Sequence, residues 1–523
     1  MEQFKNGLSQ QGTPRLLALA LTLLGGVVVG LIQFRHGIVH LLDTVTYWSG
    51  AEAVRNGNLF SSNLAPSFSN FTAIEFLDRG GQLPFVDFPI GYPLLAGFFG
   101  IFIGVRHAME LLCVLALMAI SAAFIYGSKN SATAKAQPFI MGVLGVLITM
   151  MPTTRLVTQG ALSEPLFCAV ALWLVICLAR YRSGGHWTMV AVLTIAAGLL
   201  RFIGAPLALL SGWERYKRTQ QKLSSALWSL ALMLPAALNI LLATGAGGGH
   251  NAGWRGLGHQ DMDVFVRSIG GWFDAKQGDL RRTYFTAEGP SWWSWVIALM
   301  WLALVIFAVI QLIQRSNRFP ATAEIALVAS GIISLGLIAG MMGFDALVIA
   351  DNRLMLPTGV LTLAALSWII SDQVQQRGRA LFIPAALLLV IFTICAVRPW
   401  EVGESFSESS ELKPYSQAAL DSGAVVIISN DADAVHWDTG LPTAYAPLPM
   451  QALTGQAQDV APLYANLPCA LWRANGAVVL SDGVTFSGAD IDLLNDQVDA
   501  GRLTLTSSNG ASVYLPTARA CDE

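Results

Sequence analysis

The chain of 523 residues is 54% hydrophobic and only 12% charged, against roughly 25% charged residues in a soluble domain. This composition excludes a single soluble globule, and it equally excludes disordered, collagen-like and coiled-coil chains. Residues 1–397 carry 26 Lys and Arg against 18 Asp and Glu, whereas residues 398–523 carry 5 against 16. We therefore expect an integral membrane protein with a membrane domain at 1–397, an acidic soluble domain at 398–523, and no nucleic-acid site.

The long apolar runs predict the membrane-spanning helices. The first run, Leu16 to Ile32, follows Lys5 and Arg15 and precedes no small-residue cleavage site, which indicates an uncleaved signal anchor. Further runs have about the ~20 residues that cross a bilayer. They lie at 106–126, 138–152, 164–181, 225–243, 291–313, 323–342, 354–371 and 380–397.

The stretch 187–212 decides the topology. With the N-terminus inside, the positive-inside rule also places the basic residues at 180–182 and 215–222 in the cytoplasm. Both lie inside only if 187–212 enters the membrane and returns as two short helices broken around Arg201 and Gly204–Pro206. This predicts about eleven transmembrane helices and an extracytoplasmic C-terminus. The outward segments are then 35–105, with a re-entrant or interfacial helix at Ile90–Gly104, 244–290 and 343–353.

The acidic tail has the pattern of a small extracytoplasmic α/β domain. Short β-branched runs, a hairpin and an acidic helix alternate with turn residues. The tail contains two cysteines, Cys469 and Cys521, which can pair if the domain lies outside the cytoplasm. The predicted elements are strands at Ala424–Ser429 and Ala477–Ser481, a hairpin over Leu503–Leu515 and a helix over Gly488–Gly501.

Two acidic residues of the first outward loop are candidates for chemistry. If the segment after the first span is helical, Asp43, Tyr47 and the small residues Gly50 and Ala51 share one face, and the helix stops at Asn56. A carboxylate there can approach a substrate at the membrane interface; the alternative is a helix cap or a solvated side chain. Farther on, Asp87 lies among prolines and aromatic residues, where it either contacts substrate or belongs to a structural loop.

Charged residues also lie at the outer ends of two predicted spans. Glu164 begins the span 164–181, where it either serves function at membrane depth or simply favours the helix dipole. Arg353 precedes the span 354–371, and its fork of donors suits a lipid-linked phosphate. The alternative for Arg353 is a salt bridge to Asp351 or Asp345.

Together these motifs resemble the GT-C superfamily of integral membrane glycosyltransferases. The resemblance rests on the pattern from Asp43 to Gly57, on FPIGYPLLAG, on LSEPLF, and on AGLLRFIGAP, which contains Arg201. DNRLMLP is similar to an Arg-Tyr-x-x-Pro segment of many members, with Leu354 in place of the usual Tyr. The segment IISNDADAVHWDTGLPTAYAP looks like an extracytoplasmic segment of a bacterial subset. Protein O-mannosyltransferases differ, because they carry Asp-Glu where this chain has Asp43-Thr44.

The resemblance implies transfer of a sugar, mannose or arabinose first, from a polyprenyl phosphate to an envelope glycan, glycolipid or protein acceptor. Such a hexosyl- or pentosyltransferase of the bacterial inner membrane would act on the outer face, with inversion. Asp43 would be the general base and Arg353 would bind the donor phosphate. The residues expected to orient acceptor or donor are Tyr47, Asp87, Glu164 and Arg201.

No cofactor is predicted, and no metal. The acidic pairs Asp261-x-Asp263, Asp431-x-Asp433 and Asp490-x-Asp492 are explained by surface placement. Two other functions stay open. A lipid-linked sugar flippase or transporter would also use intramembrane charges and broken helices, and a polymerase or ligase of surface glycans would move a whole oligosaccharide from the same kind of donor.

Overall fold

The computed structural model describes most of the chain, in thirteen segments. The predicted spans 291–313 and 380–397, Asp87, the boundary at 398 and nearly all of 244–290 lie outside these segments. The described residues are 2–35, 37–39, 41–59, 61–65, 72–85, 88–128, 137–246, 320–343, 352–377, 413–447, 459–481, 490–508 and 511–522.

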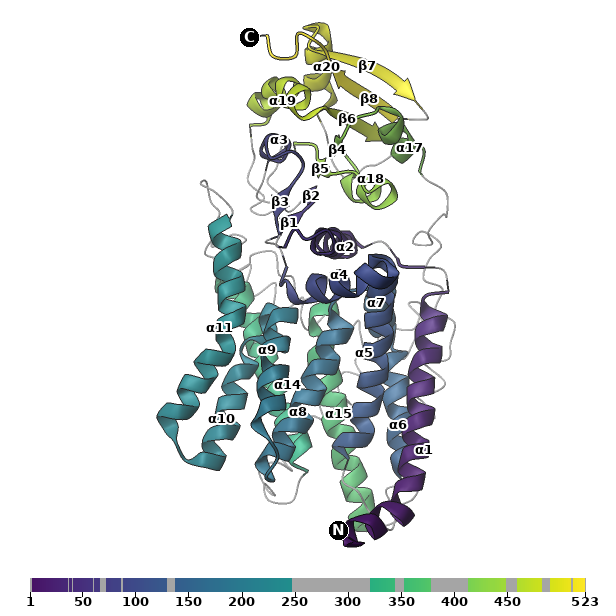
Figure 1. Cartoon of the computed structure of the whole chain (residues 1–523), viewed down its shortest axis with the longest axis vertical. Helices are drawn as coiled ribbons and strands as arrows, with labels where there is room; N and C mark the ends of the chain where they lie inside the picture. Colours follow the sequence, from purple (N-terminus) through teal and green to yellow (C-terminus); the bar gives the residue numbers. More distant parts are fainter. Residues whose placement is uncertain are drawn as a thin grey trace, which may run out of the picture.

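A bundle of apolar helices forms one end of the molecule (Figure 1). All its members except α7 overlap extensively with runs that the sequence predicts as spans, and their buried residues form one continuous core. Among the described residues, three helices are long and apolar enough to cross a bilayer: Pro14–Gln33 within α1, α5 and α8. The predicted total of eleven stays a prediction. The bundle contains α1 (Glu2–Gln33), α5 (Val105–Gly127), α6 (Gln137–Thr149), α7 (Pro152–Gln159), α8 (Glu164–Arg182), α14 (Ala321–Gly343) and α15 (Asn352–Arg377).

The stretch 187–212 is broken where the sequence predicts. Helix α9 (Trp187–Leu200) ends at Arg201, whose backbone is extended, and a short 3-10 turn, η1 (Phe202–Gly204), precedes α10 (Leu207–Thr219). Pro206 lacks an N–H and restricts the residue before it, so the chain restarts as a new helix. Helix α11 (Lys222–Ala246) then runs beside α10 and α9.

Two helices of the first loop lie between the bundle and the C-terminal sheet (Figure 1). They are α2 (Leu42–Arg55), which ends at Asn56 as predicted, and α4 (Gly91–Ile103). A Cβ atom on Gly97 would lie 2.6 Å from the Ala51 carbonyl oxygen, so α2 and α4 pack backbone to backbone. The small residues of α2 serve packing: Ala51 lies against α4, and Gly50 lies against the ring of Phe85.

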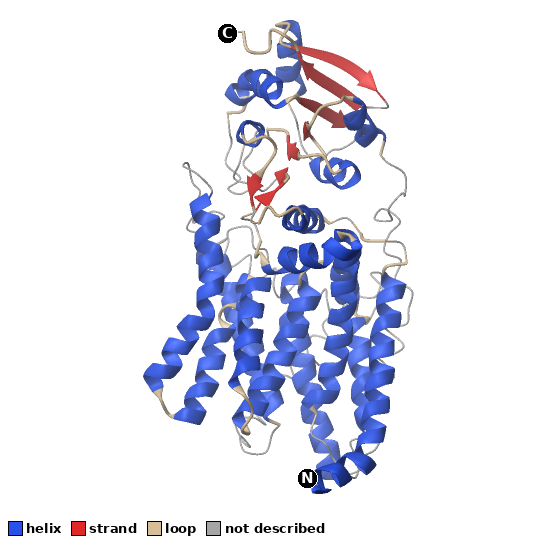
Figure 2. Cartoon of the chain, viewed as in Figure 1, coloured by secondary structure: helices blue, strands red, loops and turns tan. Residues whose placement is uncertain are grey.

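A six-stranded mixed sheet forms the opposite end of the molecule (Figure 2). Its order is β2-β5-β4-β6-β8-β7, in which β2, β5, β4 and β6 are parallel, β8 is antiparallel to β6, and β7 is antiparallel to β8. The strands are β2 (Leu64–Ala65), β4 (Val426–Ser429), β5 (Thr443–Tyr445), β6 (Gly476–Ser481), β7 (Leu503–Ser508) and β8 (Ala511–Pro516). The helices around it are α17 (Pro414–Asp421), α18 (Ala432–Thr439), α19 (Ala461–Ala474) and α20 (Ile491–Asp499).

The loop after the first predicted span completes this C-terminal domain. Strand β2 covers the edge of β5, and α3 (Ala73–Asp78) packs against α19. Phe76 and Leu77 of α3 are fully buried in the same core as the sheet. An antiparallel pair, β1 (Ser61–Ser62) and β3 (Leu83–Pro84), holds the two ends of this excursion together. The domain therefore combines a segment that precedes α5 in the sequence with the segments that follow α15.

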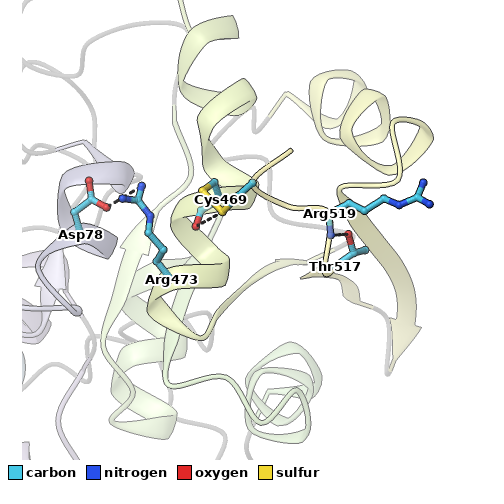
Figure 3. Close-up of a disulfide and its surroundings, with 6 residues drawn as sticks. Asp78, Cys469, Arg473, Thr517 and Arg519 are labelled. Atoms are coloured by element: carbon cyan, nitrogen blue, oxygen red, sulfur yellow. Dashed lines mark hydrogen bonds and ion pairs between the residues drawn. A yellow bond between two sulfur atoms is a disulfide. The ribbon is translucent and has the colours of Figure 1, made fainter. Parts of the chain in front are cut away.

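A disulfide closes the C-terminal domain. Cys469 of α19 and Cys521 are joined with an S–S distance of 2.13 Å. Figure 3 shows the bond beside Arg473, which forms an ion pair with Asp78 of α3 at 3.4 Å. Helix α19 is thus tied covalently to the chain end and electrostatically to the first loop.

We expect that replacing Cys469 and Cys521 by Ser destabilises this domain. The bond closes a 52-residue separation, for which the chain-entropy relation gives about 4 kcal/mol. Urea unfolding in detergent micelles, followed by tryptophan fluorescence, measures the loss. Cys177→Ser, at a half-buried free cysteine, is the matched control. Equal unfolding midpoints for the double variant and the control would contradict the expectation.

Candidate functional site

An ion pair joins the two residues predicted to act as base and phosphate ligand. Nη1 of Arg353, at the start of α15, lies 2.7 Å from Oδ2 of Asp43, in the first turn of α2. The side chains are 28% and 17% exposed. The sequence placed both residues on the outer face but did not predict that they meet, since 310 positions separate them.

A second ion pair is more deeply buried. Glu164, the first residue of α8, lies 2.8 Å from Nη1 of Arg201, at the break after α9. Their side chains are only 1% and 12% exposed. Neither carboxylate oxygen of Glu164 accepts a hydrogen bond from the described residues. The attraction to Arg201 is therefore what offsets the cost of burying this charge.

Tyr47 connects α2 to this buried pair. Its hydroxyl lies 2.9 Å from Oγ of Ser163, which also accepts a hydrogen bond from Arg201 at 3.2 Å. Tyr47 is 1% exposed, and burial raises the pKa of its hydroxyl, so the phenol stays neutral. Tyr47 is thus linked through Ser163 to Arg201, the ion-pair partner of Glu164.

The turn before Glu164 is held by side chains from two other helices. Thr44 of α2 donates to the Gly160 carbonyl and Tyr92 of α4 to the Ala161 carbonyl, each at 2.6 Å. Ala161 has φ +47°, a left-handed conformation that residues with a Cβ rarely adopt. These hydrogen bonds stabilise the strained turn and fix the start of α8 against α2.

The two ion pairs belong to one array. Arg201 interacts electrostatically with Asp43 and with Arg353 as well as with Glu164. Five of the predicted residues therefore converge where α2, α8, α9 and α15 meet, and their formal charges cancel. The sixth, Asp87, lies outside the described residues.

The C-terminal domain contacts the membrane helices through an aromatic joint beside this array. Trp48 of α2 lies edge-on to Trp437 of α18, with ring centroids 5.2 Å apart, and 5.0 Å from His436. The Arg106 guanidinium of α5 stacks over Trp437 at 4.1 Å and donates to its carbonyl oxygen. Burial lowers the pKa of His436 to about 4, so this joint keeps a neutral imidazole.

The joint brings an acidic residue of the tail close to Asp43. Asp433 of α18 accepts a hydrogen bond from the Tyr445 hydroxyl at 2.8 Å and interacts electrostatically with Asp43 and Asp431. Its Oδ1 atom is shielded from solvent although the residue as a whole is half-buried, so Asp433 is not a fully solvated surface carboxylate. A sequence signal for this contact was present, because Asp433 lies four residues before the large aromatic Trp437 on the same short helix.

Acidic clusters suited to metal ions are not found within the described segments. No group of three His, Cys, Asp or Glu side chains there has the arrangement of a metal site. Asp490 instead caps α20 by accepting the Leu493 N–H, and Asp492 is exposed. Asp261 and Asp263 lie outside the described residues.

The sequence matches no protein-family model and no curated protein. Its structure is similar to ArnT from Cupriavidus metallidurans bound to undecaprenyl phosphate, with 11% identity, a TM-score of 0.53, and 96% of this chain and 98% of that chain covered. The archaeal oligosaccharyltransferase AglB from Archaeoglobus fulgidus, in complex with an inhibitory peptide and a dolichol-phosphate, matches at 11% identity, 96% and 74% coverage, and TM-score 0.49.

The first of these likenesses settles the fold. The chain has the fold of that ArnT structure, and several of its described helices are long and apolar enough to cross a membrane. At the level of the fold this agrees with the resemblance that the sequence motifs indicated.

Removing one partner of the buried pair should destabilise the protein strongly. Arg201→Met leaves Glu164 buried without its cation, which costs about 3–5 kcal/mol. Chemical unfolding in detergent micelles measures the loss, and Arg473→Met, at a pair whose side chains are 61% and 46% exposed, is the control with about 0–1 kcal/mol expected. Similar losses in the two variants would show that the buried pair has no special structural role.

Proposed function

We propose that this protein transfers a sugar from a polyprenyl-phosphate donor to a glycan, glycolipid or protein acceptor at the outer face of the bacterial inner membrane. The observation that carries the proposal is the Asp43–Arg353 pair, an acid and a guanidinium 2.7 Å apart on a GT-C fold. The undecaprenyl phosphate bound to the ArnT structure supports a donor of this kind. Mannose and arabinose are the sugars to test first.

Asp43 acts as the general base in this proposal. The acceptor hydroxyl attacks the anomeric carbon, its proton passes to the Asp43 carboxylate, and the bond from the anomeric carbon to the phosphate oxygen breaks. The new glycosidic bond forms on the opposite face, so the configuration inverts. Asp43 suits the task because its side chain is partly exposed, whereas Glu164 is enclosed by protein.

Arg353 receives the charge that develops on the leaving lipid phosphate. Its planar guanidinium carries five N–H donors and matches phosphate oxygens in pairs. Because Arg353 already contacts Asp43, a phosphate bound to it brings the anomeric carbon next to the base. The phosphate also competes with Asp43 for the guanidinium, so donor binding loosens the resting ion pair and leaves the carboxylate able to accept a proton.

Glu164, Arg201 and Tyr47 are positioning residues in this scheme. Their contacts hold the start of α8 against α2, and Arg201 adds a positive charge behind Arg353. We assign Asp87 to orientation of the acceptor, as the sequence suggests. Without this support Asp43 and Arg353 would each have several rotamers rather than one shared arrangement.

Asp43→Asn should abolish most sugar transfer without unfolding the protein. General-base assistance contributes about 10²- to 10⁴-fold, and Asn retains the shape and a hydrogen-bond acceptor for Arg353. Transfer is measured with purified protein in nanodiscs, labelled polyprenyl-phosphate sugars and membrane glycan acceptors. Glu52→Gln, on the same helix in a surface pair with Arg55, is the control with unchanged rate. A folded Asp43→Asn protein with the wild-type rate would remove Asp43 as base.

Arg353→Ala should weaken donor binding about 10- to 100-fold, the equivalent of one lost charged hydrogen bond. Equilibrium binding of polyprenyl phosphate without a sugar measures this separately from chemistry, and Arg55→Ala is the control. Unchanged affinity would exclude the phosphate role. Movement of labelled lipid across vesicles by wild-type protein, with no sugar transfer to any acceptor, would instead identify a flippase.

A further inference from the structure

The Asp433 carboxyl has hydrogen-bonding capacity that the protein does not use. Oδ2 accepts the Tyr445 hydroxyl at 2.8 Å, but Oδ1 is shielded from bulk solvent and has no hydrogen-bond partner among the described residues. No ion pair with a cation is present within those residues either. A shielded carboxyl oxygen without a partner costs free energy, so a ligand group that reaches it gains a hydrogen bond.

The surroundings of Asp433 hold it against the helix that carries the proposed base. Ala432 and Trp437, which flank it on α18, are buried in the core of the membrane domain, and Tyr445 packs against the same core. The aromatic joint with Trp48 holds α18 to α2, the helix that carries Asp43. Asp433 is therefore held on the C-terminal domain near enough to the proposed base Asp43 to interact with it electrostatically.

The charges around Asp433 favour a neutral ligand. Asp431 and Asp43 both interact electrostatically with Asp433, and residues 398–523 carry 16 acidic against 5 basic residues. These carboxylates would repel a second phosphate, whereas a neutral hydroxyl can accept a hydrogen bond from a protonated carboxyl.

We propose that Asp433 and Tyr445 form an acceptor subsite that binds a sugar hydroxyl beside the one Asp43 deprotonates, and that this subsite selects neutral glycan acceptors over phosphate-bearing ones. The inference rests on the proposed function and adds the substrate class of its acceptor. Asp433 is here a specificity-determining residue, contributed by a domain that carries none of the other proposed reacting groups.

The protonation state of Asp433 makes acceptor binding at the proposed subsite depend on pH. Burial, the main cause, together with the charges of Asp431 and Asp43, raises the pKa of Asp433 to about 8. At lower pH Oδ1 can donate a hydrogen bond; as the pH rises through about 8 the donor is lost and a charge appears opposite Asp43. The other titratable or charged groups around it are His436 on α18, Tyr445 on β5, Tyr415 and Lys413 at α17, and Arg106 on α5.

The experiment compares full-length wild type, Asp433→Asn and Tyr445→Phe in nanodiscs, with Asp421→Asn as an exposed control in the same domain. The acceptors are an octyl glycoside and the same glycoside carrying one phosphate. We expect wild type to prefer the neutral glycoside. In both subsite variants the KM for the neutral glycoside should be about tenfold higher than in wild type, the effect of one lost hydrogen bond, with little change in kcat. The wild-type KM should rise through about pH 8, and Asp433→Asn should lack that rise.

The outcomes separate this inference from the proposed function. If wild type transfers sugar but both folded variants keep the wild-type KM and acceptor preference, the subsite is wrong while the glycosyltransferase stands. A wild-type preference for the phosphorylated glycoside also overturns the subsite. If wild type transfers sugar to neither acceptor nor to any other, both proposals fail. Should Asp433→Asn not fold, Tyr445→Phe, which removes one hydroxyl, decides alone.

Discussion

The buried ion pair between Glu164 and Arg201 is the constraint on which the rest of the site depends. A carboxylate that is 1% exposed must be neutralised where it lies, because its desolvation is expensive. The break after α9 serves this contact, since the chain leaves the helix at Arg201 and the guanidinium meets the start of α8 there. The same contact orders Ser163 and Tyr47, and through Tyr47 it sets the position of α2 and therefore of Asp43.

The C-terminal domain is held against α2 and α5 by aromatic and apolar contacts rather than by ion pairs at the surface. Trp48, Trp437 and Arg106 meet at cation–π and edge-on distances, and such contacts tolerate the acidic character of the domain. The first loop strengthens the attachment, because it adds β2 and α3 to the sheet before the chain enters the membrane helices again. The excursion leaves and returns beside α2 and α4, so the sheet cannot shift without moving α2.

Local signals predicted the parts of the fold that depend on neighbours in sequence. Apolar runs predicted α5, α8 and α14, Pro206 and Arg201 predicted the break, and β-branched runs predicted β4 and β6. The strand β2 is only two residues long and is paired with a segment nearly 380 positions away, so no periodicity could reveal it. Likewise the charged residues could be recognised as candidates, but the pairing of Asp43 with Arg353 arises from tertiary packing alone.

The cancelling charges of the array explain how the site can be both stable and reactive. In the resting protein two acids and two guanidiniums neutralise one another, so no isolated charge remains at the junction. In the proposed reaction a donor phosphate would add one anion, which Arg353 and Arg201 would neutralise while Asp43 gives up part of its contact. Loosening the resting pair costs free energy that donor binding must offset, and it leaves a more basic carboxylate. A single Asp without Arg353 would be basic but would repel the donor, so the pair is needed for both steps.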